Sequence, residues 1–243
     1  MFPLRDRNPT RHTPVVTIAL IALNALAWVF VQELGSEPGI ARSICSLGLI
    51  PGELLGLVAE GTQVSLGSGV SCVLGSGDVW HTVVTSMFLH GSWFHIIGNM
   101  WFLWIFGDNV EDELGSFRFA LFYLVSGAAA AAAQVLANPD SAVPMVGASG
   151  AIGGVMGAYA LLHPKARVDM LLFFGFFVRV IPVPAVFMLG YWLLIQVLGG
   201  LPTLGGEGDG GGVAFWAHVG GFAAGALLAY PMRQSRAKLT RRR

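Results

Sequence analysis

The chain has 243 residues, of which 54% are hydrophobic and only 12% charged, and its formal net charge at pH 7 is zero. Its mean hydropathy of +0.67 and its long apolar runs exclude an ordinary water-soluble domain and a disordered chain, and they are typical of a polytopic membrane protein. Six spans of about 20 residues would use half of the chain and leave no room for a second core. We therefore predict a single all-α membrane domain.

Six apolar segments are predicted to be membrane helices, after a polar, arginine-bearing tail at residues 1–14. The first, Val15 to Val31, is followed by no small-residue cleavage site, so we interpret it as an uncleaved span and not as a signal peptide. The other five are Trp93 to Gly107, Phe117 to Leu136, Ser149 to Leu162, about Pro184 to Gly199, and Val213 to Met232. The membrane domain is thus expected at 15–232, with a basic tail at 233–243.

The connecting segments differ in character. Residues Gln32 to about Gly91 are too many for a plain connector and are expected to form a structured, partly embedded loop. The glycine-rich stretch Gly199 to Gly212 predicts a flexible linker. The fifth span is open to another interpretation, because Met170 to Val178 is also apolar. Pro182 and Pro184 would then lie in a longer kinked helix, or the segment before Pro182 would be an interfacial stretch.

The basic residues favour this topology. With the N-terminus in the cytoplasm, all 14 Lys and Arg residues except Arg42 fall on the cytoplasmic side. Because basic residues are retained in the cytoplasm, we expect both termini there and the protein in the plasma (inner) membrane. Cys45 and Cys72, the two cysteines, both fall in the outward first loop, where a disulfide can form. Two free thiols are the alternative, since spacing does not show whether their Cα atoms come close enough.

The stretch Pro144 to Tyr159 places one hydroxyl, that of Ser149, where an irregular loop turns into a glycine-rich helix. The helix would end before His163-Pro164 and reach about 21 Å, short of a bilayer core of about 30 Å. Ser149 would then begin its helix about 9 Å below the outer surface. Irregular backbone at that depth needs surrounding protein or a water-filled cavity. The pattern therefore predicts a serine at the floor of a wet cavity within the membrane.

A histidine is expected at the same depth. His218 lies about 8 Å into the sixth span, which runs in the same direction as the fourth. Small residues line both helices and would let their backbones approach closely. They are Gly150, Gly153, Gly154 and Gly157 on the fourth span, and Ala217, Gly221 and Gly225 on the sixth. Close approach is what proton transfer from a serine to an imidazole requires.

The alternative for this pair is structural. An isolated serine at a helix start is usually a cap, and His218 would then be a buried polar link between helices. An ionisable residue inside a span is costly and favours a functional role. Because neither span contains Asp or Glu, we expect a Ser-His pair without the usual carboxylate.

The second span adds His95 and Asn99, which share one helix face and can both donate hydrogen bonds to an oxyanion. Hydrogen bonds between helices are the alternative. A metal site formed by His90, His95 and His218 is less favoured, because no carboxylate or cysteine is suitably spaced, and no cofactor is expected. The acidic run Glu111 to Glu113 is interpreted as a solvated cytoplasmic turn, with a hydrogen bond that ties spans together as the alternative.

These motifs together resemble the rhomboid family of intramembrane serine proteases. The resemblance rests on Gly147-Ala148-Ser149-Gly150, His95 with Asn99, Ala217 to Gly221, and Glu111 to Gly115, in the family's order over nearly the whole chain. It implies a six-helix bundle with a short fourth helix, Ser149 as nucleophile and His218 as general base. It also implies an oxyanion site made by His95, Asn99 and the Ser149 backbone N–H, and structural roles for Gly147, Gly150, Gly221 and Glu111.

The resemblance implies membrane-protein substrates, cut near the extracytoplasmic end of a span, and no nucleic-acid partner. The alternative is an inactive rhomboid-like chaperone that binds spans without cutting them. Two departures stand out: His81 follows Trp80 where many relatives carry arginine, and Gly153 replaces an aromatic that often packs against the catalytic histidine. The candidates to orient His218 instead are Phe215, Trp216 and Tyr159.

Overall fold

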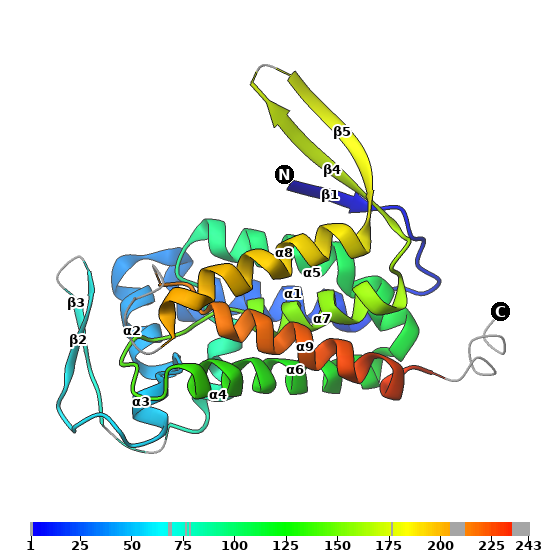
Figure 1. Cartoon of the computed structure of the whole chain (residues 1–243). Coiled ribbons are helices and arrows are strands. Elements are labelled where there is room, and N and C mark those ends of the chain that lie inside the picture. Colours follow the sequence, from blue (N-terminus) through cyan, green and yellow to red (C-terminus); the bar gives the residue numbers. More distant parts are fainter. Residues whose placement is uncertain are drawn as a thin grey trace.

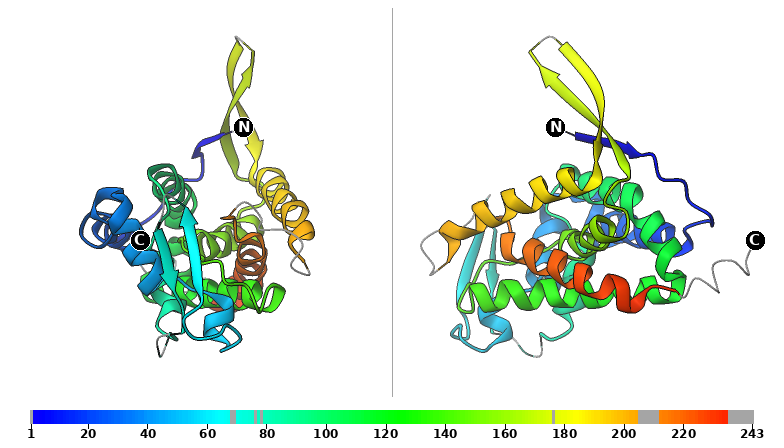
Figure 2. Two further views of the ribbon diagram at one scale, coloured as in Figure 1. Left: turned by 90° about the vertical axis from the view of Figure 1, so that its left-hand side faces the viewer. Right: turned by 45° about the vertical axis from the view of Figure 1, so that its right-hand side comes forward.

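The structure, a computed structural model, describes residues 2–67, 70–75, 77, 79–175, 177–204 and 212–234. Among these residues, the long helices lie side by side (Figure 1). They are α1 (Val15–Leu26), α5 (Trp93–Leu114), α6 (Ser116–Ala137), α7 (Ser149–Leu162), α8 (Ala185–Gly200) and α9 (Phe215–Met232). Helix α7 lies at the centre, where α5, α6, α8 and α9 all pack against it (Figure 2). Helix α1 packs on the outside of α5 and continues through a π-helical turn, Ala27–Val31.

Each segment predicted as a span is helical, and α7 has the predicted bounds. Among the described residues, two helical segments are long and apolar enough by themselves to cross a membrane: Ser116–Ala137 and Ala185–Thr203. The apolar helices Val15–Val31 and Ser149–Leu162 are shorter. Large apolar side chains cover the outside of the bundle, for example Leu136, Phe187 and Leu227, which are 81%, 70% and 77% exposed. An apolar surface of this extent is expected of helices that face lipid.

Helices α7 and α9 approach each other at glycines, as predicted. A Cβ added at Gly225 would lie 2.5 Å from the Cα of Gly154, and one added at Gly157 would lie 2.9 Å from the carbonyl carbon of Phe222. Any larger residue at these positions would force the two backbones apart, because real Cβ atoms do not come this close to other atoms. The glycines therefore fix the position of α9 on α7 and, with it, the position of the residues at the start of each helix.

The segment between α1 and α5 is structured, as predicted. It contains a 3-10 turn at Glu33–Gly35, α2 (Glu37–Leu47), α3 (Pro51–Leu54), the two-stranded sheet β2 (Gln63–Gly67) and β3 (Val70–Val73), α4 (Thr82–Thr85) and a 3-10 turn at Ser86–Phe88. Cys45 and Cys72 form a disulfide with Cα atoms 5.2 Å apart, so the bridge and not the pair of free thiols is present. It joins α2 to β3 above a small core that includes Ile50 and Leu74.

A second sheet corrects two predictions. Strands β1 (Phe2–Asp6), β4 (Arg167–Phe174) and β5 (Phe177–Pro184) form an antiparallel sheet in the order β1-β4-β5. The chain is therefore mostly helical but not all-α, and the longer kinked helix through Pro182 is wrong. The physical reason lies in β5, where β-branched Val178, Val180 and Ile181 favour a strand and the prolines cannot donate helix hydrogen bonds.

The acidic run at the end of α5 is buried, which corrects its interpretation as a solvated turn. Glu111 is 3% exposed. Its carboxylate accepts hydrogen bonds from the backbone N–H groups of Val16 and Thr17 at 3.0 and 2.8 Å, and from the hydroxyls of Thr17 and Ser116 at 2.9 and 2.6 Å. It thereby caps the first turn of α1 and ties α1 to α6, so the alternative, a structural hydrogen bond, is correct.

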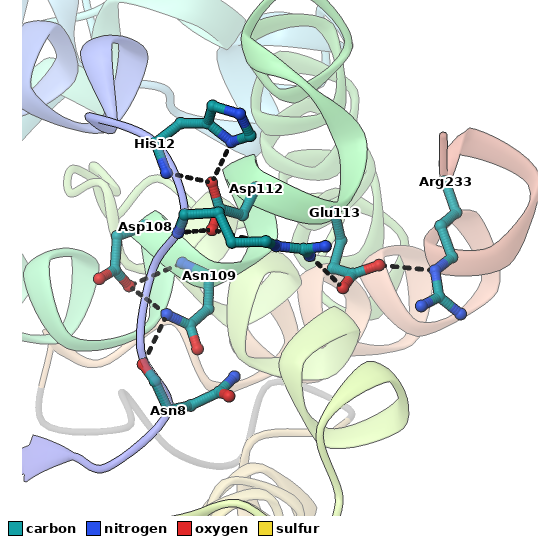
Figure 3. A network of polar contacts seen from close by, with 8 residues as sticks. Asn8, His12, Asp108, Asn109, Asp112, Glu113 and Arg233 are labelled. Carbon is teal, nitrogen blue, oxygen red and sulfur yellow. Dashed lines mark hydrogen bonds and ion pairs between the residues drawn. The ribbon is translucent and has the colours of Figure 1, made fainter. Parts of the chain in front are cut away.

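The neighbouring carboxylates fasten the N-terminal segment and the end of α9 (Figure 3). Asp112 accepts from the backbone N–H groups of Arg11 and His12, and Glu113 receives the guanidinium groups of Arg11 and Arg233 at 2.8 and 2.6 Å. Helix α5 runs on to Leu114 and not to Gly107 because these partners neutralise its buried acids.

Two predicted segments fall largely outside the described residues. Helix α8 ends at Gly200 and a 3-10 turn follows at Leu201–Thr203, but the linker predicted at Gly199 to Gly212 is otherwise mostly undescribed. The basic tail predicted at 233–243 lies outside the description beyond Gln234.

Candidate functional site

Ser149 is the first residue of α7, and the loop before it is held by the segment between α1 and α5. Met145 and Leu49 exchange backbone hydrogen bonds at 2.7 and 3.1 Å, and Gly147 N–H donates to the Ser86 carbonyl at 2.9 Å. The irregular backbone is thus enclosed by protein, as its expected depth requires. Ala148 occupies the N-cap position and no side chain caps the helix, so the interpretation of Ser149 as a cap is wrong.

The structure brings Ser149 and His218 together. The hydroxyl Oγ of Ser149 lies 2.7 Å from Nε2 of His218, which projects from the first turn of α9. Both side chains are partly buried. The contact follows from glycine packing between the two helices. Gly150, one residue after Ser149, and Gly221, three residues after His218, bring the two backbones into direct contact. The distance is that of a good hydrogen bond between a hydroxyl and an imidazole nitrogen.

Gln196 of α8 is a partner of His218 that the sequence analysis missed. Its amide oxygen Oε1 lies 2.8 Å from His218 Nδ1, and its amide Nε2 donates to the Trp192 carbonyl at 3.3 Å. The second bond fixes the orientation of the amide, so Oε1, which can only accept, faces the ring. Nδ1 must therefore carry the hydrogen and Nε2 must be the free acceptor that faces Ser149. A single amide in an otherwise apolar span was the signal that could have found it.

Trp192, one turn before Gln196 on α8, packs against His218 in place of the aromatic residue that is often found at the position of Gly153. Its ring lies 5.6 Å from that of His218, at an angle of 40°. The three aromatic candidates named from the sequence make other contacts. Trp216 donates to the Gly200 carbonyl at 3.1 Å, Phe215 lies near Gly199, and Tyr159 donates to Asp6 at 2.5 Å far down α7. The prediction that one of them orients His218 is therefore wrong.

His95 and Asn99 lie on α5 beside the serine. The backbone N–H of Gly91 donates to His95 Nδ1 at 3.3 Å, which leaves the ring hydrogen on Nε2. A Cβ at Gly147 would lie 2.8 Å from that Nε2 and 3.4 Å from Ser149 Oγ, so both atoms border the same small space. Gly147 has a φ of +133°, which favours glycine. Asn99 is 8% exposed, and its Nδ2 has no hydrogen-bond partner among the described residues.

These side chains surround one cavity of about 380 Å³. The cavity is bordered by α5, α7 and the start of α9, with Trp192 from α8, and is lined mainly by apolar side chains, including Phe94, Phe102 and Met156. Besides the indole N–H of Trp192, the side chains in its wall that can exchange protons or donate hydrogen bonds are those of Ser149, His218, His95 and Asn99. The arrangement can therefore hold a peptide carbonyl between a hydroxyl with a basic partner and two donors.

His90 takes no part in this wall. Its ring packs edge-on against that of His95 at 5.0 Å, and the described residues contain no group of three His, Cys, Asp or Glu side chains placed to hold a metal ion.

Comparison with known proteins identifies the family. The Rhomboid domain profile matches residues 76–235. The rhomboid protease GluP of Bacillus subtilis is 31% identical over 170 residues, 70% of this chain and 30% of its own length. Rhomboid protein 1 of Saccharomyces cerevisiae, a mitochondrial protein, is 30% identical over 166 residues, 67% of this chain and 44% of its own. The chloroplastic Rhomboid-like protein 11 of Arabidopsis thaliana is 42% identical over 83 residues, 34% of this chain and 29% of its own.

The chain thus spans less than half the length of each of these relatives. The matched residues nevertheless include the last part of the loop before α5 and everything from α5 to α9, which contain every residue of the site. The chain belongs to the rhomboid family of membrane-embedded helical proteins.

Proposed function

We propose that this protein is an intramembrane serine endopeptidase that uses a Ser149-His218 dyad. The observation that carries the proposal is the 2.7 Å contact between Ser149 Oγ and a His218 Nε2 that Gln196 leaves unprotonated. A serine next to an oriented, neutral imidazole is the arrangement that activates a hydroxyl for attack on a carbonyl. The Gln196 amide accepts from His218 Nδ1 as the aspartate carboxylate does in a Ser-His-Asp triad.

In the proposed reaction, His218 Nε2 takes the Ser149 hydroxyl proton while Oγ attacks the scissile carbonyl carbon. The negative charge that develops on the carbonyl oxygen is met by three donors: His95 Nε2–H, Asn99 Nδ2–H and the Ser149 backbone N–H, which has no partner within its helix. His218 then gives the proton to the leaving amine. Water, deprotonated by His218 in the same way, hydrolyses the acyl-enzyme and restores Ser149.

We further propose six spans with both termini in the cytoplasm and the site near the opposite surface. Arg11, Arg118 and Arg233 support this orientation, because all three bind at the end of the bundle away from Ser149, whereas Arg42 pairs with Glu33 in the segment after α1. Substrates would be membrane proteins cut near the extracytoplasmic end of a span. The space between His95 Nε2 and Ser149 Oγ at Gly147 is narrow, which favours a small residue before the cut, and a helix breaker would ease local unwinding.

The test is cleavage of a single-span substrate by purified protein in detergent. Ser149→Ala and His218→Ala should each abolish cleavage, because each removes half of the proton-transfer pair. Ser126→Ala, which alters a buried serine on the neighbouring helix, is the matched control and should cleave normally. His95→Ala and Asn99→Ala should each lower the rate by about 10- to 1,000-fold, since the backbone donor remains. Full activity in a folded Ser149→Ala protein would refute the proposal.

An inactive rhomboid-like chaperone is the competing function. It would need a groove for a span but no proton-transfer pair. The oriented Nε2 of His218 favours the enzyme, because a neutral ring nitrogen that faces a serine hydroxyl is required for proton transfer and is not required for binding a span.

A further inference from the structure

The hairpin formed by β4 and β5 extends away from the helices, close to the start of α8 (Figures 1 and 2). At its base Val168 and Met170 are buried in the bundle core with Ala185, and Leu172, further along β4, is also buried. Further along β5, Val178, Val180 and Ile181 are 57%, 50% and 39% exposed, and Phe2 on β1 is 41% exposed. The hairpin therefore presents apolar side chains where no described part of the chain covers them.

Both faces of the outer part of the hairpin are mainly apolar, whereas the charged residues Arg5, Asp6, Arg167 and Asp169 lie on β1 and at the base of β4. Antiparallel strands with one face in water alternate apolar and polar residues. Here the eight residues of β5, Phe177 to Pro184, include a single polar side chain, that of Arg179. In the observed register Val180 lies on the same face as Leu171, whereas Ile181 lies on the other face, beside Met170. Water on either face would be unfavourable, so a nonpolar environment must surround the projecting part.

Two observations place this sheet at the level of the membrane. Trp101 Nε1 donates to the Pro3 carbonyl of β1 at 2.7 Å. Trp101 lies seven residues, about 10 Å, before Asp108 on α5 and therefore well within the span. At its other edge, β5 runs directly into α8, whose Phe187 is 70% exposed on the lipid-facing surface. The apolar surface of the sheet is thus continuous with that of two membrane helices.

The charges on the sheet indicate which lipid surface it meets. Arg5 and Arg7 share one carboxylate, that of Asp169, at 3.1 and 2.8 Å, which leaves the group with a net positive charge. Arg167 and Arg179 are exposed as well. Pro182 and Pro184 lie on the outer strand β5 and reduce the number of unpaired N–H groups along its edge. An apolar sheet with arginines at its margin fits the boundary between the acyl chains and anionic headgroups.

We propose that the β1-β4-β5 sheet is an in-plane membrane anchor that lies in the leaflet opposite the Ser149 site and binds anionic lipid. The apolar faces of the hairpin contact acyl chains, and Arg167 and Arg179 contact phosphate groups. A second copy of this chain on the same faces is the competing occupant. The proposal does not depend on proteolysis, and its test needs no cleavage.

The test uses the full chain in vesicles of phosphatidylcholine with phosphatidylglycerol. Because Cys45 and Cys72 are bonded to each other, one introduced cysteine can be labelled selectively with an environment-sensitive fluorophore. Val180→Cys reports on the hairpin. Phe187→Cys on α8 is the matched lipid-facing control, and Asp140→Cys in the exposed loop before α7 is the water-facing control. Quenching is measured with nitroxides on the acyl chains and with iodide on both sides of the membrane.

The label at position 180 should be quenched by the nitroxides as strongly as the label at position 187, and it should be shielded from iodide. The label at position 140 should be quenched by iodide and not by the nitroxides. In vesicles of phosphatidylcholine alone the quenching by nitroxides at position 180 should fall. In the anionic vesicles, Arg167→Gln and Arg179→Gln should each lower the ratio of lipid-bound to unbound hairpin roughly fivefold, which the same quenching reports. Quenching by iodide as at position 140 would overturn the proposal. Shielding from both quenchers together with cross-linking between copies would overturn it in favour of a protein partner.

Discussion

Gly221→Ala tests whether glycine packing sets the Ser149–His218 contact. A Cβ at Gly221 would lie 2.9 Å from the carbonyl carbon of Gly150 and closer still to its oxygen, with the Ala130 methyl 3.3 Å away on the other side. Neither neighbour is a flexible side chain that could turn aside, so α9 must move from α7 by about 1 Å. The 2.7 Å contact between the serine and histidine side chains would then lengthen to about 3.7 Å, beyond hydrogen-bond range.

The expected loss of cleavage rate is about 100-fold, because a displacement of about 1 Å at reacting groups has effects of that size. Gly190→Ala on α8 is the matched control: nothing among the described residues lies within 4 Å of its added Cβ. Both variants gain about 1 kcal/mol of helix propensity, so the difference between their stabilities isolates the steric cost, about 1–3 kcal/mol. The assay is the cleavage rate of a single-span substrate together with thermal unfolding in detergent. Equal rates and equal stabilities in the two variants would refute the reasoning.

Three other perturbations test separate contacts. Gln196→Leu should lower kcat about 10- to 100-fold with little change in KM, because Nδ1 loses the acceptor that fixes its tautomer; an unchanged kcat would contradict this. Glu111→Ala should destabilise the fold by about 3 kcal/mol in unfolding assays, since four donors lose a buried charged acceptor; the exposed Glu60→Ala is its control. Burial opposes ionisation of Asp169, but hydrogen bonds from Arg5 and Arg7 outweigh it and hold its pKa below the usual value. The stabilisation of β1 by these ion pairs is therefore present above the unfolded pKa of about 4 and is lost as pH falls through the lower folded value. Protease sensitivity of the first residues measures this loss, and Asp169→Asn should remove its dependence on pH.

The bundle and the serine-histidine pair could be predicted because their signals are local and strong. Hydrophobic length identified each helical segment, and His163-Pro164 gave the end of α7. The four-residue spacing of glycines on α7 and α9 predicted their close approach, which the contacts at Gly154 and Gly225 confirm. These features depend on one segment or on two matching faces, so a sequence pattern is enough to find them.

What was missed depends on contacts between distant segments. Gln196 had no visible partner in the sequence, because its role depends on α8 lying next to α9. The acidic run at Glu111 looked solvated, because its donors at Val16 and Thr17 lie more than ninety residues earlier in the chain. The apolar run Met170 to Val178 was open to interpretation as part of a longer helix or as an interfacial stretch, because short apolar segments do not distinguish helix from strand. Its strand pairing could not be predicted, because β1 lies at the other end of the sequence.

The two halves of the candidate site are held with different rigidity. Ser149 and His218 come from helices that meet backbone to backbone, so their separation is set by contacts that cannot yield without moving a whole helix. The tautomer of His218, in contrast, depends on one amide from α8, a helix whose outer face carries exposed apolar side chains such as Phe187 and Leu194. Under the proposed function a substrate span reaches this cavity, and Trp192 of α8, one turn before Gln196, is part of the cavity wall. A displacement of α8 by the substrate would therefore act on Gln196 before it acts on the dyad distance. The basicity of His218 is therefore the property of the site most directly coupled to substrate entry, and the geometry of attack is the least coupled.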